Sequence, residues 1–193
     1  LTGFAAWTAH QYEDRSRRNT FFQLGDGKTA ALGETLRDLC DNEIEGLACF
    51  YEGSQEVTQE EFQRFAGYLS RNRAVRTWGW APAVAAESRT AVENEAHAEG
   101  LLGFEIWEAE PKGKRRRASG RPVYYPIRRV LPLKGNRELV GFDLGSEMHR
   151  RTALEAARQT GLIAGTDSIP EGRAPNGEKS ILILRPVFSA EDL

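Results

Sequence analysis

The sequence predicts an α+β domain, in which a long N-terminal helix precedes a mainly antiparallel sheet with flanking helices. Three observations predict this class. Apolar residues recur at helical spacing in the first part of the chain, strand-like runs joined by turn signals dominate the second part, and one helical stretch lies among those strands. With 193 residues, 40% of them hydrophobic, the chain can form one substantial core.

The composition favours no charged macromolecule as a partner. The formal net charge is −2, so the chain as a whole has no bias toward nucleic acid or a membrane surface. No run approaches the roughly 20 apolar residues that a membrane-spanning helix needs. Because the chain begins with Leu1 and has a single methionine, Met148, we expect it to be a fragment of a longer protein. A fragment need not carry the signal peptide or the membrane anchor of its parent.

The first helix is predicted from Thr29 to about Gly53. Its apolar residues recur every three to five positions: Leu32, Leu36, Leu39, Ile44, Leu47 and Tyr51. The pattern fits two roles, a helix packed on its own core or a stalk that rises from a membrane and pairs with a second copy.

Three further helices are marked by their ends. Thr58 and Glu61 fit a capping box at the start of the second helix, whose apolar face is predicted to contain Phe62, Phe65, Ala66 and Leu69. A polar helix is predicted over 89–100, ending at Gly100. The last is predicted to begin after Ser146 as N-cap and to end at Gly161.

Strands are predicted over six segments: 74–80, 104–110, 123–133, 138–144, 162–166 and 179–188. The basic segment 112–121 lies between two of them. Such a cluster can bind phosphates, but it has no interleaved aromatic residues, so we interpret it as a solvated loop.

Few residues point to catalysis or to a bound cofactor. The three histidines are far apart, so no metal site is expected. No nucleotide-binding or nucleophile motif is present, and Arg89 with Glu93, at helical i,i+4 spacing, is interpreted as a surface pair. Cys40 and Cys49 are expected to be free thiols. Asp143, after an apolar run, is the residue of interest, since it can hold a turn or face a ligand.

Several short motifs occur together in a fixed order. They are SQEVTQEEFQRFAGYL at 54–69, WAPAV at 80–84, YYPI at 124–127, GFDLGS at 141–146, TG at 160–161 and RPVF at 185–188. In this order they resemble the CHASE domain, the extracytoplasmic sensory domain of many bacterial and plant membrane receptors. The resemblance covers about residues 29 to 188. Each motif is weak alone, and their joint order is the specific signal.

The resemblance implies a long N-terminal helix followed by PAS-like lobes, each a curved antiparallel sheet flanked by helices. We therefore expect residues 1–52 to form a stalk and dimerisation region. Residues 53–193 are expected to form one PAS-like ligand-sensing lobe, with the second, membrane-proximal lobe partial or absent.

The resemblance also suggests a role for Asp143. In plant cytokinin receptors, which share this domain, an aspartate of the corresponding motif accepts hydrogen bonds from the adenine-like ring. The alternative is that Asp143 binds backbone amides before the following helix. Tyr124, Tyr125 and Thr166 are further candidates, although strand alternation allows at most one of the two tyrosines to face a pocket. Gly165 stands where plant receptors have a pocket-lining leucine, so a cytokinin is not the expected ligand.

The function implied by the resemblance is ligand sensing in a membrane-bound signalling receptor, such as a histidine kinase or a diguanylate cyclase. The parent protein is expected in the cell membrane, with this domain periplasmic or extracellular, working as a homodimer that binds a small molecule. No enzymatic activity, cofactor, metal or nucleic-acid partner is expected of this chain. The alternative is a dimerisation module, or one that meets a periplasmic protein partner, without a small-molecule ligand.

Overall fold

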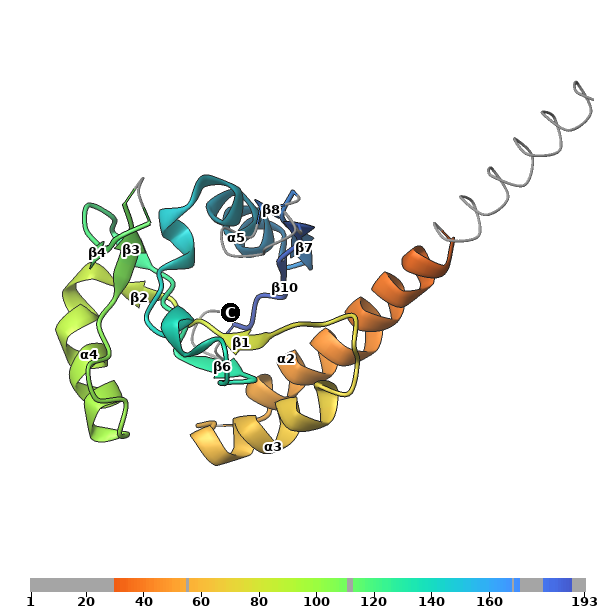
Figure 1. Ribbon diagram of the computed structural model, residues 1–193, viewed down its shortest axis with the longest axis horizontal. Coiled ribbons are helices and arrows are strands. Elements are labelled where there is room, and N and C mark those ends of the chain that lie inside the picture. Colours follow the sequence, from red (N-terminus) through yellow and green to blue (C-terminus); the bar gives the residue numbers. More distant parts are fainter. Residues whose placement is uncertain (1–29, 55, 111–112, 168, 171–178, 189–193) are drawn as a thin grey trace, which may run out of the picture. The chain divides into compact units, whose positions relative to one another are not determined.

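The computed structural model describes residues 30–54, 56–110, 113–167, 169–170 and 179–188 (Figure 1). The chain divides between Glu43 and Ile44 into two compact units. The described residues form a mixed α+β structure, in which a 23-residue N-terminal helix precedes small antiparallel sheets with helices. The predicted fold class is therefore confirmed.

The N-terminal helix covers residues 30–52, close to its predicted bounds. It contains a π-helical segment, η1 (Leu39–Ile44), followed by α2 (Glu45–Glu52). The helix ends at Gly53, whose backbone N–H donates to the carbonyl oxygen of Cys49 at 2.9 Å. In the first unit the side chain of Leu32 is largely exposed, at 60%. In the second unit α2 buries Leu47 and Ala48.

The next helix, α3 (Gln59–Leu69), has the predicted capping box. Thr58 Oγ1 accepts the N–H of Glu61 at 3.2 Å, and the Glu61 carboxylate accepts the N–H of Thr58 at 2.9 Å. These two bonds satisfy backbone donors that a helix start leaves unpaired. Phe62 and Ala66 are fully buried, and α3 packs against a strand, β6. Phe65 stacks on Phe50 of α2 with ring centroids 4.9 Å apart.

The strands are short, and within the described residues they form five antiparallel pairs. The pairs are β1 (Trp78–Trp80) with β6 (Arg129–Leu131), β2 (Val84–Ala85) with β5 (Val123–Tyr124), β3 (Trp107–Ala109) with β4 (Arg115–Arg117), β7 (Ala164–Gly165) with β10 (Ile183–Leu184), and β8 (Ile169–Pro170) with β9 (Lys179–Ser180). The predicted strand over 123–133 is thus split in two around Pro126. Proline has no N–H to donate to a ladder, which explains the interruption.

The predicted strand over 138–144 is wrong. Single 3₁₀ turns, η3 (Arg137–Leu139) and η4 (Leu144–Ser146), occupy its two ends. Between them Gly141 has a φ of 81°, outside the region that a strand residue adopts. A Cβ at this position would lie 2.2 Å from the carbonyl oxygen of Glu105, so the backbone approaches too closely for any other residue.

The interpretation of 112–121 as a solvated loop is also wrong in part, because residues 115–117 form β4. The register of β4 against β3 places Arg116 opposite Glu108 and Arg117 opposite Trp107. Cross-strand pairs of opposite charge stabilise an antiparallel ladder. The arginines are exposed, but their charges are partly neutralised, since Arg116 pairs with Glu108 and Arg117 with Glu93.

The predicted helix over 89–100 is α4 (Arg89–Ala98), which follows a short 3₁₀ turn, η2 (Ala86–Ser88). Its buried face meets the main hydrophobic core. The buried members of this core come from α4, from β2 and β5, and from the segments around β3 and β4: Val84, Ala96, Phe104, Ile106, Ala118 and Tyr124.

The last helix, α5 (Met148–Thr160), ends as predicted at Gly161, which has a left-handed φ of 68°. The predicted N-cap, Ser146, is wrong. Glu147 caps the helix instead, because its carboxylate accepts the backbone N–H groups of His149 and Arg150, each at 3.1 Å. The helix packs against η4, β7 and β10.

Candidate functional site

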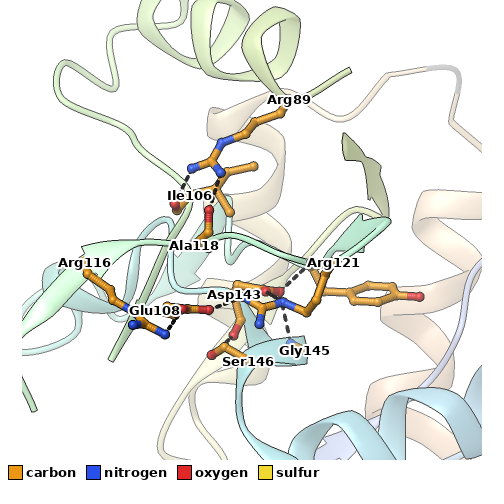
Figure 2. A network of polar contacts seen from close by, with 10 residues as sticks. Arg89, Ile106, Glu108, Arg116, Ala118, Arg121, Asp143, Gly145 and Ser146 are labelled. Carbon is orange, nitrogen blue, oxygen red and sulfur yellow. Dashed lines mark hydrogen bonds and ion pairs between the residues drawn. The ribbon is translucent and has the colours of Figure 1, made fainter. Parts of the chain in front are cut away.

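The carboxylate of Asp143 is fully buried and accepts hydrogen bonds on both oxygens (Figure 2). Oδ1 accepts the backbone N–H groups of Tyr125 at 2.7 Å and of Gly145 at 3.0 Å. Oδ2 accepts from Nε of Arg121 at 2.9 Å. A buried carboxylate requires such partners, because burial without them is costly.

The backbone groups of Asp143 are hydrogen-bonded as well as its side chain. Its N–H donates to the carbonyl oxygen of Trp107 at 2.8 Å. Its carbonyl oxygen accepts from Ser146, from the N–H at 3.0 Å and from the hydroxyl at 2.6 Å. The predicted alternative role, binding backbone amides before the following helix, is therefore present. Contact between Asp143 and a ligand stays a prediction.

Arg121 joins Asp143 to a second buried carboxylate. Its guanidinium bonds Asp143 through Nε and Glu108 through Nη2, and Nε of Arg116 donates to Glu108 at 2.7 Å (Figure 2). Burial alone raises the pKa of Glu108, but the hydrogen bonds and charges of the two arginines outweigh it, so the pKa lies below its ordinary value. Burial lowers the pKa of Arg121, but the hydrogen bonds and charges of the two carboxylates outweigh it, so the pKa is raised above its ordinary value. The result is a charge network between β3, β4 and the segment before α5.

Arg89 and Glu93 form the predicted i,i+4 pair at 2.9 Å, but they do not lie on the surface. Each side chain is only 11% exposed. The Arg89 guanidinium also donates to the carbonyl oxygens of Ile106 at 2.6 Å and Ala118 at 2.5 Å (Figure 2). Glu93 accepts the N–H of Ile106 at 3.0 Å. This pair therefore joins α4 to Ile106, just before β3, and to Ala118, just after β4.

The two predicted tyrosines differ in burial. Tyr124 is 5% exposed and belongs to the main core. The guanidinium carbons of Arg89 and Arg121 lie 5.3 and 5.5 Å from its ring centroid, within cation–π range. Tyr125 is half-buried. A Cβ on Gly145 would lie 3.4 Å from the Tyr125 ring and 3.3 Å from Oδ1 of Asp143, so Tyr125 borders the Asp143 site.

Gly165 and Thr166 belong to a different part of the fold. Gly165 is exposed on β7, and Thr166 follows it. The Thr166 N–H donates to the carbonyl oxygen of Leu182 at 2.9 Å, and its hydroxyl accepts the N–H of Leu182 at 3.0 Å. Among the described residues, no hydrogen bond links either residue to Asp143. The structure thus brings Asp143 together with the two tyrosines and leaves Gly165 and Thr166 in the β7–β10 pair.

Arg121 and Glu108, the two charged residues next to Asp143, are not among the site residues predicted from the sequence. Arg121 ends the basic segment 112–121, two residues before the strand that carries Tyr124. Glu108 was counted only as a polar residue of an alternating strand. In the described ranges no group of three or more histidine, cysteine, aspartate or glutamate side chains is arranged to hold a metal ion. Cys40 and Cys49 are free thiols, as expected.

No helix in the described part of the chain is long and apolar enough to cross a membrane. A comparison with protein-family models matches residues 55–193 to the CHASE domain. No curated protein matches the chain significantly. The matched segment contains the charge network around Arg121, the Arg89–Glu93 pair and every candidate site residue. The CHASE domain is a sensor module that is not itself catalytic. The chain belongs to the CHASE domain family, the extracytoplasmic sensor domains of signalling receptors.

Proposed function

We propose that this CHASE domain binds a small molecule beside Asp143 and signals as a homodimer through its N-terminal helix. One observation carries the ligand part of the proposal: a fully buried carboxylate has one charged partner among the described residues, Arg121, and lies next to the half-buried residue Tyr125. The pKa of Glu108 is lowered and that of Arg121 is raised beside it, and such shifted pKa values are common at functional sites.

The acceptor capacity of Asp143 supports a ligand that presents N–H groups. An ionised carboxylate offers about four acceptor positions. The described residues fill three of them, two on Oδ1 and one on Oδ2. A ligand N–H can therefore share Oδ2 with Arg121, or replace the Arg121 Nε–H while Glu108 retains the guanidinium. Either change alters the contacts of the segment that precedes α5.

The N-terminal helix is the proposed dimer contact, and residues 1–52 the proposed stalk region. Leu32 lies on the apolar stripe of this helix and is 60% exposed, so its own chain leaves it available to a second copy. In a membrane-anchored parent such as a histidine kinase or a diguanylate cyclase, the membrane raises the local concentration of the two copies. Ligand binding then biases two arrangements of the dimer.

The ligand contact is tested with Asp143→Asn, with adenine and other N–H-bearing heterocycles as probes. Asparagine exchanges one acceptor oxygen for an NH₂ donor, so affinity for a bound probe should fall on the order of tenfold to a hundredfold. Asp167→Asn is the matched control, since the Asp167 side chain is 93% exposed. Titration calorimetry and thermal melts are run on both variants. An unchanged dissociation constant in Asp143→Asn contradicts the ligand contact.

The dimer contact is tested by analytical ultracentrifugation of the chain over a wide concentration range. Leu32→Glu places a charge on the apolar stripe and should weaken self-association. Arg37→Glu, at an exposed position of the same helix, is the control for a change of charge. Equal self-association of the two variants contradicts the helical interface. The interface is also contradicted if the wild-type chain is monomeric at every concentration and still does not dimerise when it is tethered to a membrane.

A further inference from the structure

We infer that Arg150 binds an oxyanion group of the sensed molecule, a carboxylate or a phosphate, so that the ligand of this domain is an anionic small molecule. The inference rests on the proposed function, because it names the chemical class of the ligand. Two observations support it: the position of Arg150 on α5, and the absence of a carboxylate near its guanidinium among the described residues.

Arg150 occupies the inward face of α5. The half-buried or buried residues of this helix after Met148 and His149 are Arg150, Ala153, Leu154 and Ala157, at spacings of three and four. This spacing defines the stripe of an amphipathic helix that packs on its own domain. α5 packs against η4, β7 and β10 (Figure 1). A permanently charged side chain therefore takes the first position of a stripe whose other members are apolar.

Arg150 is also unlike the other arginines that are not exposed. Each of the others has a carboxylate within 4.0 Å: Arg89 with Glu93, Arg121 with Asp143 and Glu108, Arg128 with Glu95 and Glu99, Arg129 with Glu99, and Arg185 with Glu45 and Glu52. No carboxylate of the described residues lies within this distance of the Arg150 guanidinium. The nearest acidic residue in sequence, Glu147, uses its oxygens on backbone N–H groups.

The surroundings of Arg150 compensate its charge only in part. Its guanidinium carbon lies 5.3 Å from the ring centroid of Phe142, a cation–π contact. Burial lowers the pKa of Arg150, and the opposing effect of the Glu147 charge is smaller. Arginine stays protonated under these conditions, so the domain keeps a poorly solvated cation whose guanidinium donates to none of the described residues. Phe142 directly precedes Asp143, which places this cation next to the segment that holds the proposed ligand site.

An oxyanion is the ligand group that matches these donors. The planar guanidinium offers N–H groups in a fork whose geometry fits a carboxylate or a phosphate with two parallel bonds. Such a pair is stronger where water is partly excluded. A bound anion would supply the partner that no described residue gives to Arg150.

The experiment compares the wild-type chain with Arg150→Met, Arg150→Lys and Arg151→Met. Arg151 is the adjacent, exposed arginine and is the matched control for charge. Acetate, succinate, citrate and phosphate are titrated at constant ionic strength set with chloride, and melting temperature and calorimetric heat are measured. We expect a saturable response to at least one of these anions in wild type and in Arg151→Met. Arg150→Lys should bind at least tenfold more weakly, since lysine lacks the fork, and Arg150→Met should not respond.

A second readout separates ligand binding from a purely structural role. Without added anion, Arg150→Met should melt no lower than wild type, because methionine keeps the packing length and removes an uncompensated charge. A marked fall in its melting temperature overturns the inference, as does a wild type with no saturable response to any of the four anions. If the wild type responds to an N–H heterocycle in an Asp143-dependent manner and to no anion, the inference fails while the proposed function stands.

Discussion

Nε of Arg121 lies 2.9 Å from Oδ2 of Asp143, a carboxylate with no exposed surface. The same carboxylate holds the N–H of Tyr125, the second residue of the YYPI segment, and that of Gly145 in η4. The carboxylate therefore fixes the YYPI and GFDLGS segments, two of those that carry the family resemblance, against each other. Glu108 also pairs with Arg121, so removal of Asp143 leaves the guanidinium with a partner, whereas removal of Arg121 leaves the Asp143 charge uncompensated in the interior.

Replacement of Arg121 by methionine should destabilise the fold strongly. Both Asp143 and Glu108 lose their hydrogen bonds to the guanidinium, and Asp143 has no other charged partner among the described residues. Breaking a buried pair in this way costs about 3–5 kcal/mol in the free energy of unfolding. Urea denaturation followed by circular dichroism measures this change. Arg137→Met, at an exposed position, should change the free energy by less than about 0.5 kcal/mol. Similar midpoints for the two variants would show that the network contributes little.

Replacement of Gly141 by alanine should also destabilise the fold, by a different mechanism. The φ of 81° is unfavourable for alanine, and its Cβ would lie 2.2 Å from the carbonyl oxygen of Glu105. Because the contact is with backbone, the chain around Trp107 must move, and we expect a loss of more than about 2 kcal/mol. Gly67→Ala in α3 is the control. Apart from its chain neighbours and the backbone of its own helix, no atom lies within 4 Å of the Cβ there, so alanine should stabilise the helix slightly. Equal melting temperatures for the two variants contradict the close approach.

The sequence predicted those features that depend on a few neighbouring residues. The capping box of Thr58 and Glu61 and the helix end at Gly161 are local hydrogen-bonding and φ preferences, and both are confirmed. The end of the N-terminal helix at Gly53 is another local feature that the sequence predicted. The α+β class followed from the order of such local patterns, which needs no knowledge of how the elements pack.

The partners of Asp143 could not be predicted in the same way. Arg121 and Glu108 are separated from Asp143 by 22 and 35 positions. The β3–β4 hairpin brings Glu108 close to Arg121, and the bond from the Asp143 N–H to the carbonyl oxygen of Trp107 brings Asp143 to both. An apolar run at 138–144 indicates burial, and burial alone does not distinguish a strand from two 3₁₀ turns around a glycine. The GFDLGS motif identified Asp143 as a special position, but the contacts that make it special are long-range.

Replacement of Tyr51 by phenylalanine should raise stability. The Tyr51 ring stacks on Trp80 with centroids 3.8 Å apart, and its hydroxyl is buried without a hydrogen-bond partner among the described residues. Burial raises the pKa of this hydroxyl, and the nearby charge of Arg129 offsets the effect only in part. Phenylalanine keeps the stacked ring and removes the unsatisfied group, a gain of about 1 kcal/mol. Thermal melts compare Tyr51→Phe with Tyr68→Phe, at an exposed position of α3. A lower melting temperature for Tyr51→Phe would indicate that the hydroxyl has a partner, such as a buried water.

Stability should fall in acid because of carboxylates such as Glu108. Its pKa in the folded chain lies below the ordinary value of 4.5, since the two arginines outweigh the effect of burial. The unfolded chain therefore binds a proton at a higher pH than the folded chain does. The sign follows from linkage: the stabilisation is fully present above pH 4.5 and is lost as the pH falls through the lower, folded-state pKa. Glu93 and Glu147, whose pKa values are also lowered, should act in the same direction.

The contribution of Glu108 is measured with Glu108→Gln, by urea denaturation at several pH values from neutral to about 3. Glutamine cannot take up the proton, so the variant should be less stable than wild type at neutral pH and should lose less stability on acidification. The two stability curves should therefore converge in acid. Glu87→Gln, at an exposed position without an ion pair among the described residues, should follow the wild-type curve in parallel. If the Glu108→Gln curve also runs parallel to wild type, Glu108 has the same pKa in both states, and Arg121 and Arg116 do not stabilise its charge in solution.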